Sequence, residues 1–203
     1  ATKGWQVAAT DIRVAFLNAP KRDTSKLTAC EIPSVFKKVG LAAEDDVWIV
    51  QMALYGLGSS PKDWSIHRDQ TLPTLRWERE EEGKQWIGAL VPSGDDNVWR
   101  MIEVDNKVEE HRWVGVMTVY VDDLMFAAEK EVIDLVYAAI SGVWALSDLE
   151  VASDETPVKY CGFEIYEDGQ HDGFHLNQCM YEKEILKKWE VGSPIEYPNC
   201  RVA

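Results

Sequence analysis

The chain has 203 residues, a mass of 23.1 kDa and a 46% hydrophobic composition, which predicts one sizeable core or one core with an appendage. Its formal net charge of −14 repels polyanions at long range and counts against nucleic-acid binding. We find no run of about eighteen apolar residues and no signal-peptide pattern, so we expect no membrane partner and an intracellular, cytoplasmic location. Four widely separated cysteines predict reduced thiols rather than a disulfide framework; they are Cys30, Cys161, Cys179 and Cys200.

The N-terminal part of the chain predicts two strands and one helix. Residues 7–16 are typical of a strand that ends in a helical or turn segment, and residues 47–52 (VWIVQM) of a second strand. Ser59 or Ser60 followed by Pro61 predicts a helix start, because serine can cap exposed amides and proline suits the first helical position. We expect this helix to run to Leu72.

The remainder of the chain mixes hairpins and helices without strict alternation. Residues 129–146 predict a helix, with Val132, Val136, Ala139 and Val143 on one face. The other predicted elements are a hairpin at 77–91, a loop at 92–97, paired strands at 98–104 and 113–121, a hairpin of 158–166 with 173–176, and a helix at 180–189. This order predicts an α+β fold, with an antiparallel sheet covered by helices.

Tryptophans and a histidine-cysteine series have ordinary interpretations. Trp48, Trp64 and Trp144 lie on apolar faces, which predicts core positions. His171, His175 and Cys179 recur at four-residue spacing, but glycines between them break any helix, so the spacing does not predict a zinc site.

The stretch GVMTVYVDDLMFAA, residues 115–128, places two adjacent carboxylates inside an apolar run. The pairs at 45–46 and 95–96 are typical of solvated turns, whereas Asp122 and Asp123 are flanked by predicted buried strands. Asp-Asp is a poor choice for a two-residue hairpin turn, which favours residues that tolerate positive φ. Two anions against a buried sheet cost several kcal/mol unless they are neutralised, and a divalent cation neutralises them efficiently.

Four sequence blocks occur in an order that matches a known family. They are AATDIRVAFLNAP at 8–20, ALYGLGSSPKDW at 53–64, VYVDDLMFAA at 119–128 and VKYCGFEIYEDG at 158–169, and HLNQCMYEKEILKKW follows at 175–189. Together they resemble the reverse transcriptase of copia-type long-terminal-repeat retrotransposons across nearly the whole chain. The resemblance implies an RNA-directed DNA polymerase of a Pol polyprotein, with an RNA template, a DNA primer and dNTPs as partners and virus-like particles as a further location.

The resemblance also implies roles for the carboxylates. Asp11 matches the first catalytic aspartate of the family's palm domain, and Asp122 and Asp123 match the pair on its catalytic hairpin. These three would hold two Mg²⁺ ions, or Mn²⁺ in their place, for nucleotidyl transfer onto a primer 3′-hydroxyl. Asp11 and Asp122 are the expected bridging ligands.

Seven further positions acquire roles from the same blocks. Phe16 is expected beneath the sugar, where a ring would exclude a 2′-hydroxyl, although a plain core position is the local alternative. Tyr55 and Gly56 match the nucleotide and template pocket, and an ordinary strand-to-helix turn is the alternative there. Tyr120, the tyrosine of the Tyr-x-Asp-Asp sequence, is also expected to bind substrate. The block of Tyr160, Cys161 and Gly162 resembles the primer grip, which positions the primer end.

The resemblance predicts a reverse-transcriptase palm at 1–20 and 53–170, partial fingers at 21–52, and the start of the thumb or connection at 171–203. Because the chain begins ten residues before Asp11 and stops near the thumb, we expect a palm-centred piece of a longer polyprotein, inactive in isolation.

Two alternatives to an active enzyme stay open. A catalytically inactive, decayed palm is favoured by the acidic charge and by Gly58-Ser59, where the family usually carries Lys-Gln; the intact Asp11, Phe16 and Asp122-Asp123 favour the enzyme. Another palm-type two-metal nucleotidyltransferase or cyclase shares the carboxylates, but it does not explain the block at 53–64.

Overall fold

The computed structural model describes residues 4–21, 25, 27–105, 108, 110–169 and 173–189. The chain divides into two compact units, one of residues 1–12 with 75–203 and one of residues 13–74. In the described part, no helix combines the length and the apolar character that crossing a membrane requires. Cys30, Cys161 and Cys179 are free thiols, as predicted, and Cys200 lies outside the described residues.

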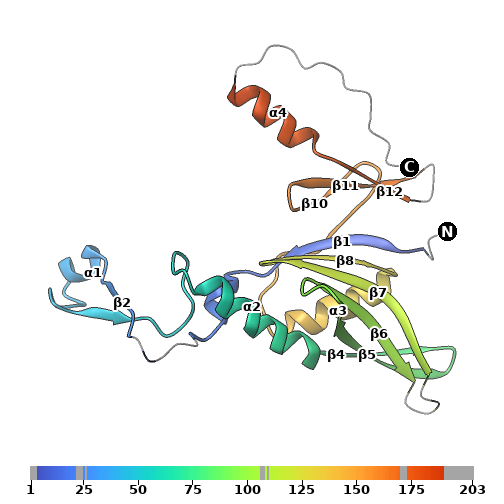
Figure 1. The fold of residues 1–203 in the computed structure, drawn as a ribbon, viewed down its shortest axis with the longest axis horizontal. Helices are drawn as coiled ribbons and strands as arrows, with labels where there is room; N and C mark the ends of the chain where they lie inside the picture. The colour runs from blue at the N-terminus through green and yellow to red at the C-terminus, as the bar shows by residue number, and fades with distance from the viewer. Residues whose placement is uncertain are drawn as a thin grey trace. The chain divides into compact units, whose positions relative to one another are not determined.

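A seven-stranded sheet forms the centre of the first unit (Figure 1). Its strand order is β4-β5-β6-β7-β8-β1-β9, and every neighbouring pair is antiparallel. The strands are β1 (Gln6–Asp11), β4 (Arg76–Glu81), β5 (Lys84–Pro92), β6 (Val98–Asp105), β7 (Glu110–Tyr120), β8 (Asp123–Ala128) and β9 (Glu150–Val151).

Burial along the central strands alternates with the period of two that a pleated strand imposes. In β7 and β8 the inward positions are Met117, Val119, Leu124 and Phe126, all of which are buried. The predicted α+β class and the antiparallel sheet are therefore confirmed.

Helix α3 (Lys130–Ser141) packs on this sheet against β4 and β8. Its buried face consists of Val132, Ile133, Val136 and Ile140, at the spacing of an amphipathic helix. The prediction that the helix continues to residue 146 is wrong, and Val143, beyond its end, is exposed. The chain instead turns back at Gly142, so that Leu146 forms an antiparallel bridge with Ile12.

A separate three-stranded sheet follows, with the order β10 (Val158–Tyr160), β11 (Phe163–Asp168) and β12 (Gly173–Asn177). The predicted single strand at 158–166 is wrong, because a turn at Cys161 and Gly162 divides it. Buried Val158 and Ile165 of this sheet pack with Val7 and Ala9 of β1. Helix α4 (Cys179–Lys188) comes last, close to the predicted 180–189.

The second unit contains η1 (Ala15–Asn18), β2 (Ala29–Glu31), α1 (Ser34–Lys38), β3 (Val47–Ile49), α2 (Ser60–Thr71) and η2 (Leu72–Thr74). Helix α2 begins where predicted, but the Ser60 hydroxyl binds the main chain of Leu54 instead of capping the helix. Trp64 is buried, as is Trp144 in the other unit. The core position predicted for Trp48 is wrong, because β2 and β3 form only a two-stranded sheet and leave the indole 45% exposed.

The predicted division into palm, fingers and thumb remains a prediction. The two compact units follow contacts within the chain, and of the predicted thumb segment at 171–203 the structure describes residues 173–189.

Candidate metal centre

The hairpin between β7 and β8 presents two of the three predicted catalytic aspartates. Tyr120 pairs with Asp123 across the hairpin, so the two-residue turn consists of Val121 and Asp122 rather than of both aspartates. Val121 adopts φ 57°, a conformation that β-branched residues rarely occupy. Placing the valine in this strained position leaves Asp122 in the turn and Asp123 as the first residue of β8.

The third aspartate comes from the neighbouring strand. Asp11 is the last residue of β1 and pairs directly with Asp123, and the amide of Ile12 donates a 2.9 Å hydrogen bond to the carbonyl of Asp122. The carboxylates of Asp11, Asp122 and Asp123 offer ligand atoms that all lie within 4.8 Å of one another. All three residues are half-buried. In the described residues no other set of histidine, cysteine, aspartate and glutamate side chains meets this criterion.

The electrostatics of this trio favour a cation. Burial raises the pKa of the Asp123 carboxyl above its ordinary value, and the negative charges of Asp122 and Asp11 raise it further. Three oxygen donors at half-buried positions suit a hard divalent cation such as Mg²⁺ or Mn²⁺, which keeps waters on its remaining positions. The donor set therefore fits the metal that the sequence predicts.

The predicted primer-grip residues lie in a tight turn of the same unit. Cys161 and Gly162 connect β10 and β11 with φ values of 50° and 80°, the pair of positive angles typical of a type I′ hairpin turn. Burial raises the pKa of Tyr160 to about 12, and the charge of Asp123 contributes to this rise. Burial also raises the pKa of the Cys161 thiol, with a contribution from Asp123. Tyr160 and Cys161 thus lie within electrostatic reach of Asp123.

Three of the predicted substrate-binding residues belong to the other unit. The rings of Phe16 and Tyr55 form a tilted pair with centroids 4.7 Å apart. Phe16 is half-buried and Tyr55 is 53% exposed, so neither is a plain core residue. Gly56 adopts φ 92°, which an L-residue side chain would disfavour. Tyr120, by contrast, lies in β7 beside the aspartates and is exposed.

The other two aspartate pairs differ from this trio. Both are exposed, as predicted for solvated turns. Asp46 accepts a 2.7 Å hydrogen bond from the amide of Ala43, and Asp95 accepts one of 2.8 Å from the amide of Asn97. These carboxylates stabilise their own turns, so adjacency of aspartates alone does not make a site.

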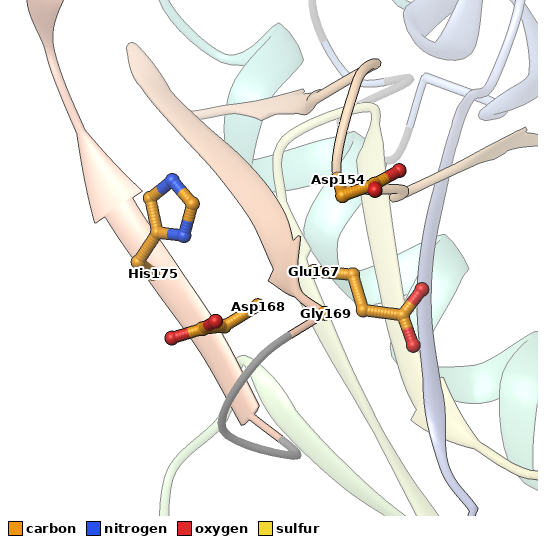
Figure 2. A pocket seen from close by; sticks show the side chains of 5 residues that line it. All are labelled: Asp154, Glu167, Asp168, Gly169 and His175. Carbon is orange, nitrogen blue, oxygen red and sulfur yellow. The ribbon is translucent and has the colours of Figure 1, made fainter.

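An open pocket of about 340 Å³ lies along the small sheet (Figure 2). Asp154, Glu167, Asp168, Gly169 and His175 line it, and Figure 2 shows the Asp168 and Glu167 side chains pointing in different directions, as neighbours on a strand do. The His175 ring stacks on Tyr166 at 5.0 Å. Glu167 and Asp168 point away from each other here, whereas the carboxylates of the aspartate trio converge.

Residues that support Asp11 were missed at the sequence level. Ser147 binds both the amide and the carbonyl of Asp11, from a segment 136 positions along the chain. In the sequence, Ser147 is an ordinary polar residue in a connecting segment, and only the long-range pairing of that segment with β1 reveals the contact.

Comparison with known proteins gives no match: no family model, no curated protein and no solved structure is similar enough to report.

Proposed function

We propose that this chain is the palm region of an RNA-directed DNA polymerase of the copia retrotransposon type, which transfers dNTPs onto a primer 3′-hydroxyl. The observation that carries the proposal is the convergence of Asp11, Asp122 and Asp123 from two antiparallel strands and their connecting turn. The same three residues stand in sequence blocks that resemble the catalytic motifs of that family, in the same order. An antiparallel sheet with a helix on it is compatible with a palm.

The aspartates would act as ligands that hold the reacting groups in place. Asp11, Asp122 and Asp123 would hold the divalent ions through their carboxylate oxygens, with Asp11 and Asp122 as the principal ligands. The ions would supply activation of the attacking 3′-oxygen and stabilisation of the leaving pyrophosphate. The raised pKa of Asp123 supports this assignment, because a carboxylate that binds its proton more tightly also gains more from a neighbouring cation.

The aromatic residues and the second turn would select and position the substrates. The resemblance of the sequence blocks assigns Phe16 and Tyr55 to nucleotide binding, and within their own unit the two rings form a pair on which a sugar or base could lie. The turn at Cys161-Gly162 would hold the primer end, which is consistent with the effect of the Asp123 charge on Tyr160. The partners are then an RNA template, a DNA primer and dNTPs, with the remainder of a Pol polyprotein supplying other surfaces.

A second function is an inactive palm that retains the fold but not the polymerase reaction. The formal net charge of −14 favours it, because this charge repels a nucleic-acid backbone, and Gly58-Ser59 offers no basic side chain to the template.

Primer extension distinguishes the two. The longest open reading frame that contains this chain is assayed with dNTPs and Mg²⁺ on a primed RNA template, beside Asp122→Asn and the exposed-pair control Asp96→Asn. The polymerase proposal predicts extension by the wild type and by Asp96→Asn, and a loss of at least about a hundredfold in Asp122→Asn. A folded wild type that extends no primer would establish the inactive palm instead.

A further inference from the structure

Ser147 lies on the edge of β1 opposite to β8. After α3 ends, residues 146–151 run antiparallel to β1: Leu146 bridges Ile12, and β9 pairs with Ala8 and Ala9. Between these two pairings one main-chain hydrogen bond runs from the amide of Ser147 to the carbonyl of Asp11, and Ser147 Oγ replaces the main-chain acceptor for the amide of Asp11. Ser147 therefore lies beside Asp11, the last residue of β1.

Ser147 forms hydrogen bonds with both the amide and the carbonyl of Asp11. The amide of Asp11 donates to Ser147 Oγ at 2.8 Å, and the amide of Ser147 donates to the carbonyl of Asp11 at 2.9 Å. The carbonyl of Ser147 accepts from the hydroxyl of Thr10 at 2.8 Å and from the hydroxyl of Tyr137 on α3 at 2.9 Å. Every polar atom of Ser147 therefore has a partner.

Proton counting fixes the direction of the remaining contact. Thr10 Oγ1 and Ser147 Oγ lie 3.1 Å apart, and each hydroxyl has one proton to donate. Because Thr10 has given its proton to the carbonyl of Ser147, the Ser147 hydroxyl is the donor to Thr10. The same oxygen accepts from Asp11, so the rotamer of Ser147 is defined by two bonds of opposite direction. Thr10 is buried, which shields the pair from competing water.

Asp11 needs such support because its carboxylate converges on two others. The three carboxylates offer oxygen atoms within 4.8 Å of one another, so their negative charges repel in the metal-free protein. Pairing with β8 fixes Asp11 from one side only, since Asp11 is the last residue of its strand. The bonds from Ser147 to the amide and the carbonyl of Asp11 fix its peptide from the other side.

We propose that Ser147 is a positioning residue for the metal centre: its hydroxyl and amide hold the main chain of Asp11 so that the carboxylate stays in reach of Asp122 and Asp123. The inference depends on the proposed function, because it concerns the same metal centre. Ser147 contacts no reacting group and acts through Asp11 alone.

The test is titration of the metal-free protein with Mn²⁺ by isothermal calorimetry, with the wild type, Ser147→Ala, Ser147→Thr and Ser141→Ala. Ser141 is the matched control, because its hydroxyl bonds only within the end of α3, to the carbonyl of Ala138. We expect Mn²⁺ affinity to fall roughly three- to tenfold in Ser147→Ala, the scale of one lost hydrogen bond. Ser147→Thr keeps the hydroxyl and is expected to recover most of the affinity, and Ser141→Ala is expected to match the wild type.

Tyr137→Phe separates positioning from general stability. This variant removes a hydrogen bond to Ser147 but leaves the bond to Asp11, so we expect it to lower thermal stability with Mn²⁺ affinity within about twofold of the wild type. A Ser147→Ala protein that is folded and binds Mn²⁺ like the wild type would overturn the positioning role alone. A wild type that binds no Mn²⁺ would overturn the metal centre itself, and the positioning role with it.

Discussion

The seven-stranded sheet contains two groups of carboxylates with different surroundings. Arginines surround the first group, whereas the members of the second group lie next to one another. Glu81 and Glu103 form an arginine-bound group with Arg79 and Arg112. Glu103 is fully buried and accepts hydrogen bonds from Trp77 at 3.1 Å and from Arg112 at 3.0 and 2.6 Å. Arg112 also binds Glu81, and Arg79 donates to Glu81 at 2.6 Å. Asp11, Asp122 and Asp123 form the second group, at the other end of β7 and β8.

The pKa values of the carboxyls are shifted in opposite directions in the two groups. A hydrogen bond from Arg112 lowers the pKa of Glu81, and the charges of Arg112 and Arg79 add to the effect. Burial and two neighbouring carboxylates raise the pKa of Asp123. The first group is neutralised by the protein's own cations, so it stabilises the fold. The second group concentrates negative charge, which costs stability without a cation and suits a site that binds one.

Breaking the arginine-bound group has the largest expected effect. Arg112→Met removes the cation from fully buried Glu103 and the stacking of the guanidinium, 3.8 Å from the centre of the Trp86 ring. We expect the free energy of unfolding to fall by about 3–5 kcal/mol, because an uncompensated charge remains buried. Urea unfolding measures the change. Lys130→Met, which breaks an exposed pair with Asp134, is the control and is expected to cost no more than about 0.5 kcal/mol. Equal effects in the two variants would contradict the comparison.

Neutralising the aspartate group is expected to act in the opposite direction. Asp123→Asn keeps the shape of the side chain but removes one of three repelling charges, so the metal-free protein should gain about 1 kcal/mol. The same variant should lose the stabilisation that Mg²⁺ gives the wild type. Thermal unfolding with and without Mg²⁺ measures both changes, with exposed Asp96→Asn as the control. A less stable metal-free Asp123→Asn would argue against repulsion in this group.

The two groups are also expected to change the stability of the protein with pH in opposite directions. The raised pKa of Asp123 means that the folded state holds this proton to higher pH than the unfolded chain, whose carboxyl titrates near 3.8. The metal-free protein therefore loses stability at this site as pH rises from that value through the folded pKa. Glu81 has a lowered pKa, so its contribution is present above 4.5 and is lost as pH falls through the folded pKa.

Urea unfolding from acidic to neutral pH checks these signs. The advantage of Asp123→Asn over the wild type should grow as pH rises from 3.8 through the folded pKa of Asp123, whereas the deficit of Glu81→Gln should grow as pH rises through the folded pKa of Glu81 toward 4.5. Parallel pH profiles for the two variants would refute the opposite assignments.

The smallest expected effect concerns the turn that presents Asp122. Glycine adopts φ 57° without the strain that Val121 has there, so Val121→Gly should stabilise the protein by about 0.5 kcal/mol after its greater unfolded-state entropy is counted. Val143→Gly, at an exposed position outside the left-handed region, should instead destabilise it by about 0.5–1 kcal/mol. If Val121→Gly destabilises as much as Val143→Gly, the valine is not strained.

Much of the sheet could be predicted because its strands alternate in hydrophobicity and their turns contain recognisable residues. The hairpin of β4 and β5, for example, turns at Glu82 and Gly83, within the hairpin predicted at 77–91. The end of α3 could not be predicted, because its apolar spacing continues past Ser141, where pairing of Leu146 with Ile12 prevails over helix propensity. Trp48 is exposed for a related reason, since a two-stranded sheet offers little to cover it.

The three aspartates that converge in the structure were among the residues predicted from the sequence, but the residue that supports Asp11 was not. An aspartate pair within an apolar run is unusual enough to suggest a metal centre, and Asp11 followed from the resemblance alone. Ser147 could not be found, because a serine 136 positions from Asp11 acquires its role only when residues 146–151 pair along β1. The place of the strained Val121 in the turn could not be predicted either, because two-residue hairpin turns favour residues that tolerate positive φ.

Electron paramagnetic resonance of bound Mn²⁺ tests the central claim most directly: that Asp11, Asp122 and Asp123 together bind divalent cations. The metal-free wild type and Asp122→Asn are titrated side by side, and the bound fraction is counted from the loss of the free-ion signal. The account predicts bound Mn²⁺ in the wild type and an affinity at least about tenfold weaker in Asp122→Asn. Equal binding by the two proteins would contradict it.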